Sequence, residues 1–176
     1  METENDLRHL ESIRDAIERS VTEDDFAQIR AELSDYGYVK KHSAAAKKKK
    51  SAAKPLHFVS EDGFHIYVGK NNYQNEAVTF GLAEGGDWWF HAKGAPGSHV
   101  IVKSGSAEPS DRTFEAAAAL AAFYSALKDA PKAEVDYTKK KNIKKPAGGR
   151  PGFVIYHTNY SMSVAPGVDP GLKPVK

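Results

Sequence analysis

The sequence predicts an α+β fold with a mixed, mainly antiparallel sheet, one principal alanine-rich helix and a short helical hairpin before the sheet. Three observations lead to this prediction. Apolar residues recur at helical spacing near the N-terminus, short apolar runs separated by turn residues begin at residue 55, and one long alanine-rich segment interrupts these runs. A single helix among many short strands is typical of α+β folds and disfavours a doubly wound parallel sheet.

Residues 1–38 are expected to form two amphipathic helices, because apolar residues lie three or four positions apart along one helical face. The two apolar stripes consist of Leu7, Leu10, Ile13 and Ile17, and then of Phe26, Ile29 and Leu33. Thr22 followed by Asp25 predicts a capping box at the start of the second helix. Because two helices of roughly four turns bury little surface by themselves, we interpret the segment as the end of a truncated coiled coil. A hairpin that needs a partner is the alternative.

Residues 39–54 are rich in lysine and alanine and contain seven lysines and no acidic residue. Such low-complexity basic segments are typical of flexible linkers. The same lysines could attract phosphate groups, and this role is compatible with that of a tether.

Strand patterns begin at residue 55. Two apolar runs flank Asp62-Gly63, which predicts a β-hairpin. Thr113 is expected to cap a helix that ends at about Leu127, and its small-residue face would allow close packing on a sheet. The remaining expectations are an irregular loop at 71–75, a strand or helical turn at 78–82, strands at 88–91, 99–103, 135–138, 153–157 and 162–164, and a flexible tail after about 166.

Composition excludes several classes of protein. The 176 residues include no cysteine, which excludes a disulfide scaffold, a thiol nucleophile and cysteine-based metal sites. No apolar run approaches the ~18–20 residues that span a bilayer, and the acidic N-terminus lacks the pattern of a secretory signal. We therefore expect a cytoplasmic protein without a membrane partner.

Charge is distributed unevenly along the chain. Residues 1–38 carry four arginines and eleven acidic residues, a net charge of −7, whereas residues 39–176 carry a net charge of +9. A basic domain behind an acidic helical segment favours a polyanionic partner, although solubility alone could also explain the charge.

Basic residues concentrate between positions 139 and 150, where six cations occur without an acid. Contacts with backbone phosphates need charge rather than a fixed geometry, so a loop of this composition suits a nucleic acid. Lys93 and Lys103 add charge near aromatic residues. The predicted nucleic-acid-binding residues are Lys93, Lys103, Lys139, Lys140, Lys141, Lys144, Lys145 and Arg150.

Asp87, His91 and His99 are the only compact group of potential acid–base or metal-binding residues in the sequence. On a strand, Asp87, Trp89 and His91 would share one face. We expect these side chains to fix a loop through hydrogen bonds, with direct nucleic-acid contact or a divalent metal site as alternatives. No phosphate-binding glycine motif or metalloprotease motif occurs. We therefore expect no catalytic residue, metal or cofactor.

The segment 87–100 reads DWWFHAKGAPGSHV and resembles the signature of the NFACT-R domain. The resemblance extends over 55–166, and the preceding helices resemble the end of the coiled coil found just before NFACT-R in bacterial RqcH-type ribosome-quality-control factors, once called fibronectin-binding protein A. The residues of the signature loop, expected to be structural or to contact RNA, are Asp87, Trp88, His91, Gly94, Gly97, Ser98 and His99.

The resemblance implies a function beyond RNA binding in general. RqcH-type factors bind large ribosomal subunits obstructed by peptidyl-tRNA, together with alanine tRNA, and support C-terminal alanine tailing of the stalled chain. Peptidyl transfer would be ribosomal, so this chain is expected to be a binding module rather than an enzyme. Its further partner would be the remainder of the factor, with an N-terminal NFACT domain, a helix–hairpin–helix segment and a coiled coil.

Two other functions remain as alternatives. The first is a surface adhesin that binds fibronectin or another host matrix protein. The second is a metal-dependent enzyme centred on Asp87, His91 and His99.

Overall fold

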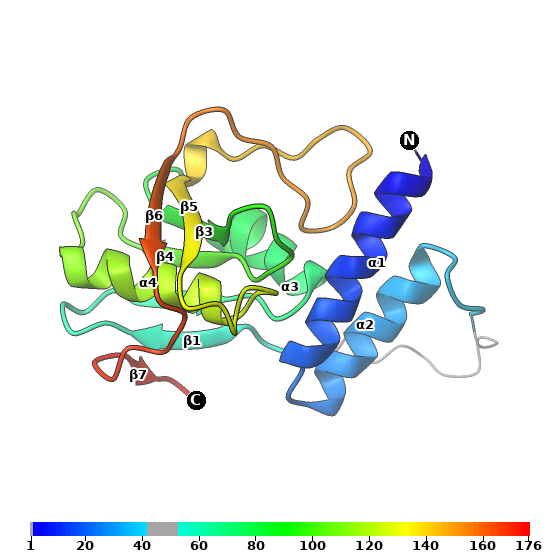
Figure 1. Ribbon diagram of the computed structural model, residues 1–176, viewed down its shortest axis with the longest axis horizontal. Coiled ribbons are helices and arrows are strands. Elements are labelled where there is room, and N and C mark those ends of the chain that lie inside the picture. Colours follow the sequence, from blue (N-terminus) through cyan, green and yellow to red (C-terminus); the bar gives the residue numbers. More distant parts are fainter. Residues whose placement is uncertain (1, 42–52) are drawn as a thin grey trace.

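The computed structural model describes residues 2–41 and 53–176. It shows a seven-stranded antiparallel sheet with the strand order β6-β5-β3-β4-β2-β1-β7, preceded by a helical hairpin (Figure 1). The predicted α+β class is therefore confirmed. The elements are α1 (Glu2–Arg19), α2 (Glu23–Asp35), β1 (Leu56–Val59), β2 (His65–Val68), α3 (Asn72–Glu76), the π-helix η1 (Ala77–Leu82), β3 (Trp88–Ala92), β4 (Val100–Lys103), α4 (Asp111–Phe123), β5 (Ala133–Lys139), the 3-10 helix η2 (Lys140–Asn142), β6 (Tyr160–Val164) and β7 (Lys173–Pro174).

Two apolar layers cover the two faces of the sheet. On one face, the alanine-rich helix α4 packs against Trp88 and Phe90 of β3 and the neighbouring strands. On the other face, Trp89 and Ile101 pack with η1 and with Ile143. The alternation predicted for β3 thus separates its two tryptophans onto opposite faces of the sheet.

Helix α4 begins three residues earlier than the sequence predicted. Ser110 is the N-cap, and its hydroxyl accepts a hydrogen bond from the backbone N–H of Thr113 at 3.3 Å. The Thr113 hydroxyl instead donates to Asp62 in the β1–β2 turn at 2.5 Å. The prediction that Thr113 caps the helix was wrong because two hydroxyl residues three positions apart compete for one role.

The segment 72–82 is helical, which corrects the loop predicted at 71–75. The side chain of Asn71 accepts a hydrogen bond from the N–H of Gln74 and so caps α3, which continues into η1. Asparagine favours loops and helix N-caps for the same reason, since its short amide group bonds to nearby backbone. Sequence alone therefore did not distinguish the two.

Two C-terminal expectations also differ from the structure. Residues 153–157 form no strand; Ile155 makes only an isolated antiparallel bridge with Lys144. The segment after 166 returns to the sheet, where β7 pairs with β1 and Leu172 is buried in the main core. Apolar contact and a strand ladder thus hold a segment whose composition predicted a flexible tail.

The hairpin α1–α2 lies beside the sheet (Figure 1). The apolar residues of α1 are either exposed or packed against α2. Leu7 is 57% exposed, whereas Ile13 is 3% exposed and packs with Ile29 between the two helices. The buried positions on α1 are mostly polar. The capping box of Thr22 and Asp25 forms as predicted. Of the predicted linker 39–54, residues 42–52 lie outside the described part.

Candidate nucleic-acid interface

The signature segment forms the antiparallel hairpin β3–β4 and the loop between these strands. The 93–98 loop is fixed to the C-terminal end of α4. The N–H of Ser98 donates to the carbonyl of Tyr124 at 2.8 Å, and Gly97 forms a β-bridge with Ser125. A Cβ at Gly97 would lie only 2.7 Å from the Cβ of Ser125, so this close approach requires glycine. The loop therefore connects β3, β4 and α4 structurally.

Asp87 stabilises the turn that precedes β3. Its carboxylate accepts hydrogen bonds from the N–H groups of Glu84 and Gly105, at 2.8 and 2.9 Å, and from the Lys103 ammonium at 2.6 Å. Burial alone would raise the pKa of Asp87, but these three donors outweigh it and hold the pKa below its ordinary value. Asp87 is thus an ionised structural anchor, and Lys103 is its partner.

His91 and His99 lie together on the face of the sheet opposite α4, with ring centroids 5.4 Å apart. The Nδ1 atom of His99 is 2.7 Å from the Thr79 hydroxyl, and the backbone N–H of His99 donates to Asn75. Burial lowers the pKa of His91 to about 4 and that of His99 well below its usual value. Both imidazoles are therefore neutral at pH 7 and add no positive charge to an interface.

Asp87 is bound to the turn and does not complete a metal site with the two histidines. Among residues 2–41 and 53–176, no group of three or more His, Cys, Asp or Glu side chains could hold a metal ion. The predicted alternative of a metal-dependent enzyme at Asp87, His91 and His99 therefore lacks its ligand set in this structure.

A hollow of about 350 Å³ opens beside the signature loop. Neutral imidazoles, side-chain amides and glycine-bearing backbone line it, together with charged side chains from α1. This lining offers hydrogen-bond donors and acceptors, including the hydroxyl groups of Ser12 and Tyr156. Its members include His91, Gly94, Gly97, His99, Asn72, Asn75, Arg8, Glu11 and Tyr156.

Three of the eight predicted phosphate-binding residues are held by carboxylates. Lys103 binds Asp87, Lys145 binds Glu76, and Arg150 binds Asp6 at 2.5 Å. Arg150 also lies over the ring of Tyr36, 4.8 Å from its centroid. The ion pairs of Lys103 and Lys145 lie within the sheet domain, whereas the ion pair of Arg150 joins this domain to α1. Their role as phosphate ligands would require the ion pairs to open.

The other five cations are held less strongly by the protein and are therefore more available to bind a phosphate. Lys93 is more than half exposed and lies 3.8 Å from the exposed Glu134. Lys139 donates to the carbonyl of Gly86 and lies over the Trp88 ring. Among the described residues, Lys140, Lys141 and Lys144 form no ion pair, and Lys141 and Lys144 are exposed. A phosphate that binds Lys140, Lys141 or Lys144 would have to displace no carboxylate of the described residues, so its binding there costs least.

The basic residues do not form one continuous patch. Lys139, Lys140 and Lys141 lie beside the 82–87 turn, because Lys139 is opposite Trp88 in the register and the N–H of Lys141 donates to Gly85. Lys93 follows the other end of β3, about 17 Å away at 3.3 Å per residue. The segment 139–150 is organised by η2 and by the Lys144–Ile155 bridge rather than being a free loop.

A buried polar network that the sequence did not predict joins the hairpin to the sheet domain. Lys70 donates to Asp25 at 2.8 Å, and the side-chain amide of Gln74 donates to the same carboxylate. Arg19 reaches the carbonyls of Lys70 and Tyr124. The only sequence signal is a run of polar residues at 70–76 within an otherwise apolar region.

Comparison with known proteins agrees with this arrangement of fold and loop. Residues 54–157 match the family model described as the NFACT protein RNA binding domain. The chain belongs to this family of RNA-binding domains. RNA binding is the activity that the family's description names. The signature loop and the basic residues described above fall inside the matched range.

Similar curated proteins carry the name Rqc2 homolog RqcH. The protein from Bacillus subtilis is 40% identical over 151 residues, which cover 85% of this chain and 26% of the relative. The Streptococcus suis protein is 39% identical over 170 residues, covering 96% and 30%. A solved structure, the C-terminal part of the fibronectin/fibrinogen-binding protein from Streptococcus suis, aligns with a TM-score of 0.86 at 38% identity and covers 94% of this chain and 66% of that one. This chain thus spans less than a third of the length of these curated relatives.

Proposed function

We propose that this chain is the RNA-binding module of a ribosome-quality-control factor. The observation that carries the proposal is the match of residues 54–157 to the NFACT RNA-binding domain, together with RqcH relatives at about 40% identity. The proposed phosphate contacts are Lys140, Lys141 and Lys144, with Lys139 and Lys93 at the margins. The lack of ion pairs among the described residues supports the first three, and Lys141 and Lys144 are also exposed.

We further propose the partners of the whole factor. It would bind large ribosomal subunits obstructed by peptidyl-tRNA, together with a tRNA, for which alanine tRNA is the candidate, and support C-terminal alanine tailing in the cytoplasm. The module would act as an adaptor, because peptidyl transfer would be carried out by the ribosome. Within the described residues, no helix combines the length and apolar character needed to cross a membrane.

The lysines are tested by the triple variant Lys140→Ala/Lys141→Ala/Lys144→Ala. Each phosphate contact contributes about −0.7 to −0.9 to the slope of log K against log salt, so the variant should flatten the slope for tRNA by about 2. A matched control removes three other exposed lysines, in Lys128→Ala/Lys132→Ala/Lys173→Ala. If both triple variants have the wild-type slope, these lysines do not contact phosphates.

Fibronectin binding is a second candidate, favoured by the name of the similar solved structure. Binding to immobilised fibronectin, measured with and without competing tRNA, separates the two functions. Saturable binding to fibronectin in the absence of any binding to tRNA or ribosomal subunits would favour the adhesin.

A further inference from the structure

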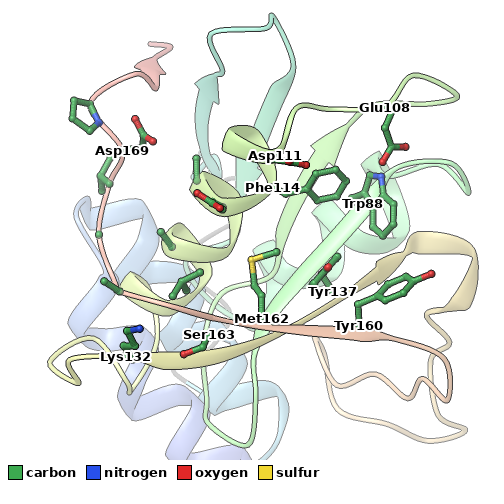
Figure 2. Close-up of a pocket in the computed structure, with 18 residues that line it drawn as sticks. Trp88, Glu108, Asp111, Phe114, Lys132, Tyr137, Tyr160, Met162, Ser163 and Asp169 are labelled. Atoms are coloured by element: carbon green, nitrogen blue, oxygen red, sulfur yellow. The ribbon is translucent and has the colours of Figure 1, made fainter.

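A groove of about 1040 Å³ lies on the α4 face of the sheet, and Lys139 lies over the ring of Trp88 at its edge. Figure 2 shows Trp88, Tyr137 and Tyr160 gathered at one end of this groove, with Phe114 of α4 beside them. Lys132 and Ser163 lie at the other end. The groove therefore has an aromatic end built from β3, β5, β6 and α4.

The aromatic rings form a contiguous cluster. Trp88 meets Phe114 edge to face at 5.0 Å between centroids, and Tyr137 stacks with Tyr160 at 5.5 Å. Tyr160 is 63% exposed although it is large and partly apolar. The faces of such rings carry partial negative charge and attract ammonium and guanidinium groups.

Three acidic residues line the same groove. Glu108, Asp111 and Glu115 are exposed, and within the described part of the chain none of them forms an ion pair. Asp111 also lies in the first turn of α4, where the helix dipole stabilises a carboxylate, so Asp111 alone would not indicate a ligand. Glu108 and Glu115 lie outside the first turn of α4, so the helix dipole does not account for them. Three carboxylates disfavour a phosphate and favour a cation here.

A buried donor at the same end has no partner. Trp88 is 8% exposed, and its Nε1 atom has no hydrogen-bond acceptor among the described residues. Figure 2 shows this nitrogen turned toward Glu108 at the mouth of the groove. Buried unpaired N–H groups are rare in folded proteins. A backbone carbonyl of an incoming chain would satisfy this one.

We propose that this groove binds a basic segment of a protein partner. A lysine or arginine side chain would lie against the exposed ring of Tyr160 beside Glu108 and Glu115, because Lys139 already lies over the Trp88 ring. A backbone carbonyl would accept a hydrogen bond from Trp88 Nε1. The carboxylates of the groove would attract a basic peptide to this part of the domain. The rest of the domain would repel it, because residues 39–176 carry a net charge of +9. The groove would thus let one domain bind RNA on one surface and a basic protein on another.

The probe is a labelled peptide in which arginine alternates with alanine, and the control peptide has glutamine in place of arginine. The chain contains two tryptophans, so a ¹⁵N-correlated spectrum has two indole N–H signals, which Trp88→Phe assigns. The arginine peptide is expected to shift the Trp88 signal and leave that of Trp89 in place. Glu108→Gln/Glu115→Gln should weaken binding about fivefold or more, since two exposed charge pairs are lost.

The acidic hairpin is the competing site for a basic peptide. Glu4→Gln/Glu18→Gln removes two exposed charges there and is expected to leave the affinity unchanged. If both double variants weaken binding equally, the peptide binds through general charge attraction, and the proposal is overturned. A Trp88 shift caused by a single-stranded RNA oligomer but not by the arginine peptide would assign the groove to RNA instead.

Discussion

The buried pair between Lys70 and Asp25 is the residue-scale contact that most directly joins the hairpin to the sheet domain. The Lys70 side chain is 6% exposed and that of Asp25 is fully buried, and their charged atoms lie 2.8 Å apart. Val21, Thr22 and Gln74 donate to the same carboxylate. A buried pair with this many donors is costly to break from one side, because the remaining charge keeps its burial and loses its partner.

Removing the cation should therefore destabilise the chain. We expect Lys70→Met to lower the free energy of unfolding by about 3 kcal/mol, measured by urea denaturation. Lys93→Met is the matched control, and its exposed side chain should make it neutral within about 0.5 kcal/mol. A Lys70→Met variant as stable as the control would mean that the pair does not hold the hairpin in place.

Stability should also depend on pH through Asp25. Burial would raise the pKa of its carboxyl, but the hydrogen bonds from Lys70, Val21, Thr22 and Gln74 lower it to about 2. The unfolded chain binds this proton at a pKa of about 3.9. The carboxyl thus stabilises the fold above about pH 4, and this contribution, roughly 2 kcal/mol, is lost as the pH falls toward 2. Denaturation curves at several pH values should show a smaller acid loss in Asp25→Asn/Lys70→Met. Equal losses would contradict the lowered pKa.

At the scale of elements, the sequence predicted the class of fold and most of the strands. The positions of apolar residues along a strand directly indicate which side chains are buried against each face of the sheet. The β3 alternation and the capping box of α2 are examples. The orientation of the hairpin was not predictable in this way. Its surface toward the sheet is polar and gains its stability from long-range partners, such as Arg19 with Tyr124, that no local pattern contains. The same limit applies to the candidate site, where the partners of Lys103, Lys145 and Arg150 lie 16, 69 and 144 residues away.

Two substitutions in α1 test this orientation. Ile13→Ala should lower the free energy of unfolding by about 2–4 kcal/mol, because it opens a cavity between α1 and α2. Leu7→Ala belongs to the same sequence stripe but is exposed, so it should change stability by less than about 0.5 kcal/mol. Thermal unfolding of both variants measures the difference. A larger loss for Leu7→Ala would mean that the apolar stripe is buried after all.

The whole molecule combines two oppositely charged parts with different surfaces. The acidic hairpin docks through buried polar contacts, and the basic sheet domain carries exposed lysines beside the 82–87 turn on one surface and an acidic aromatic groove on another. The two surfaces adjoin at Lys139, which lies over the Trp88 ring of the groove. In the proposed function, the sheet domain contacts RNA, and the hairpin is fixed to it by the buried polar contacts.

The most direct measurement of the central claim is binding of this chain to deacylated tRNA and to purified large ribosomal subunits across a salt series. With three to five phosphate contacts, the slope of log K against log salt should lie between about −2 and −4. Tight binding at low salt with this slope would establish an independent RNA-binding module. Absence of binding to both at low salt would contradict the account and assign the RNA affinity to other parts of the longer factor.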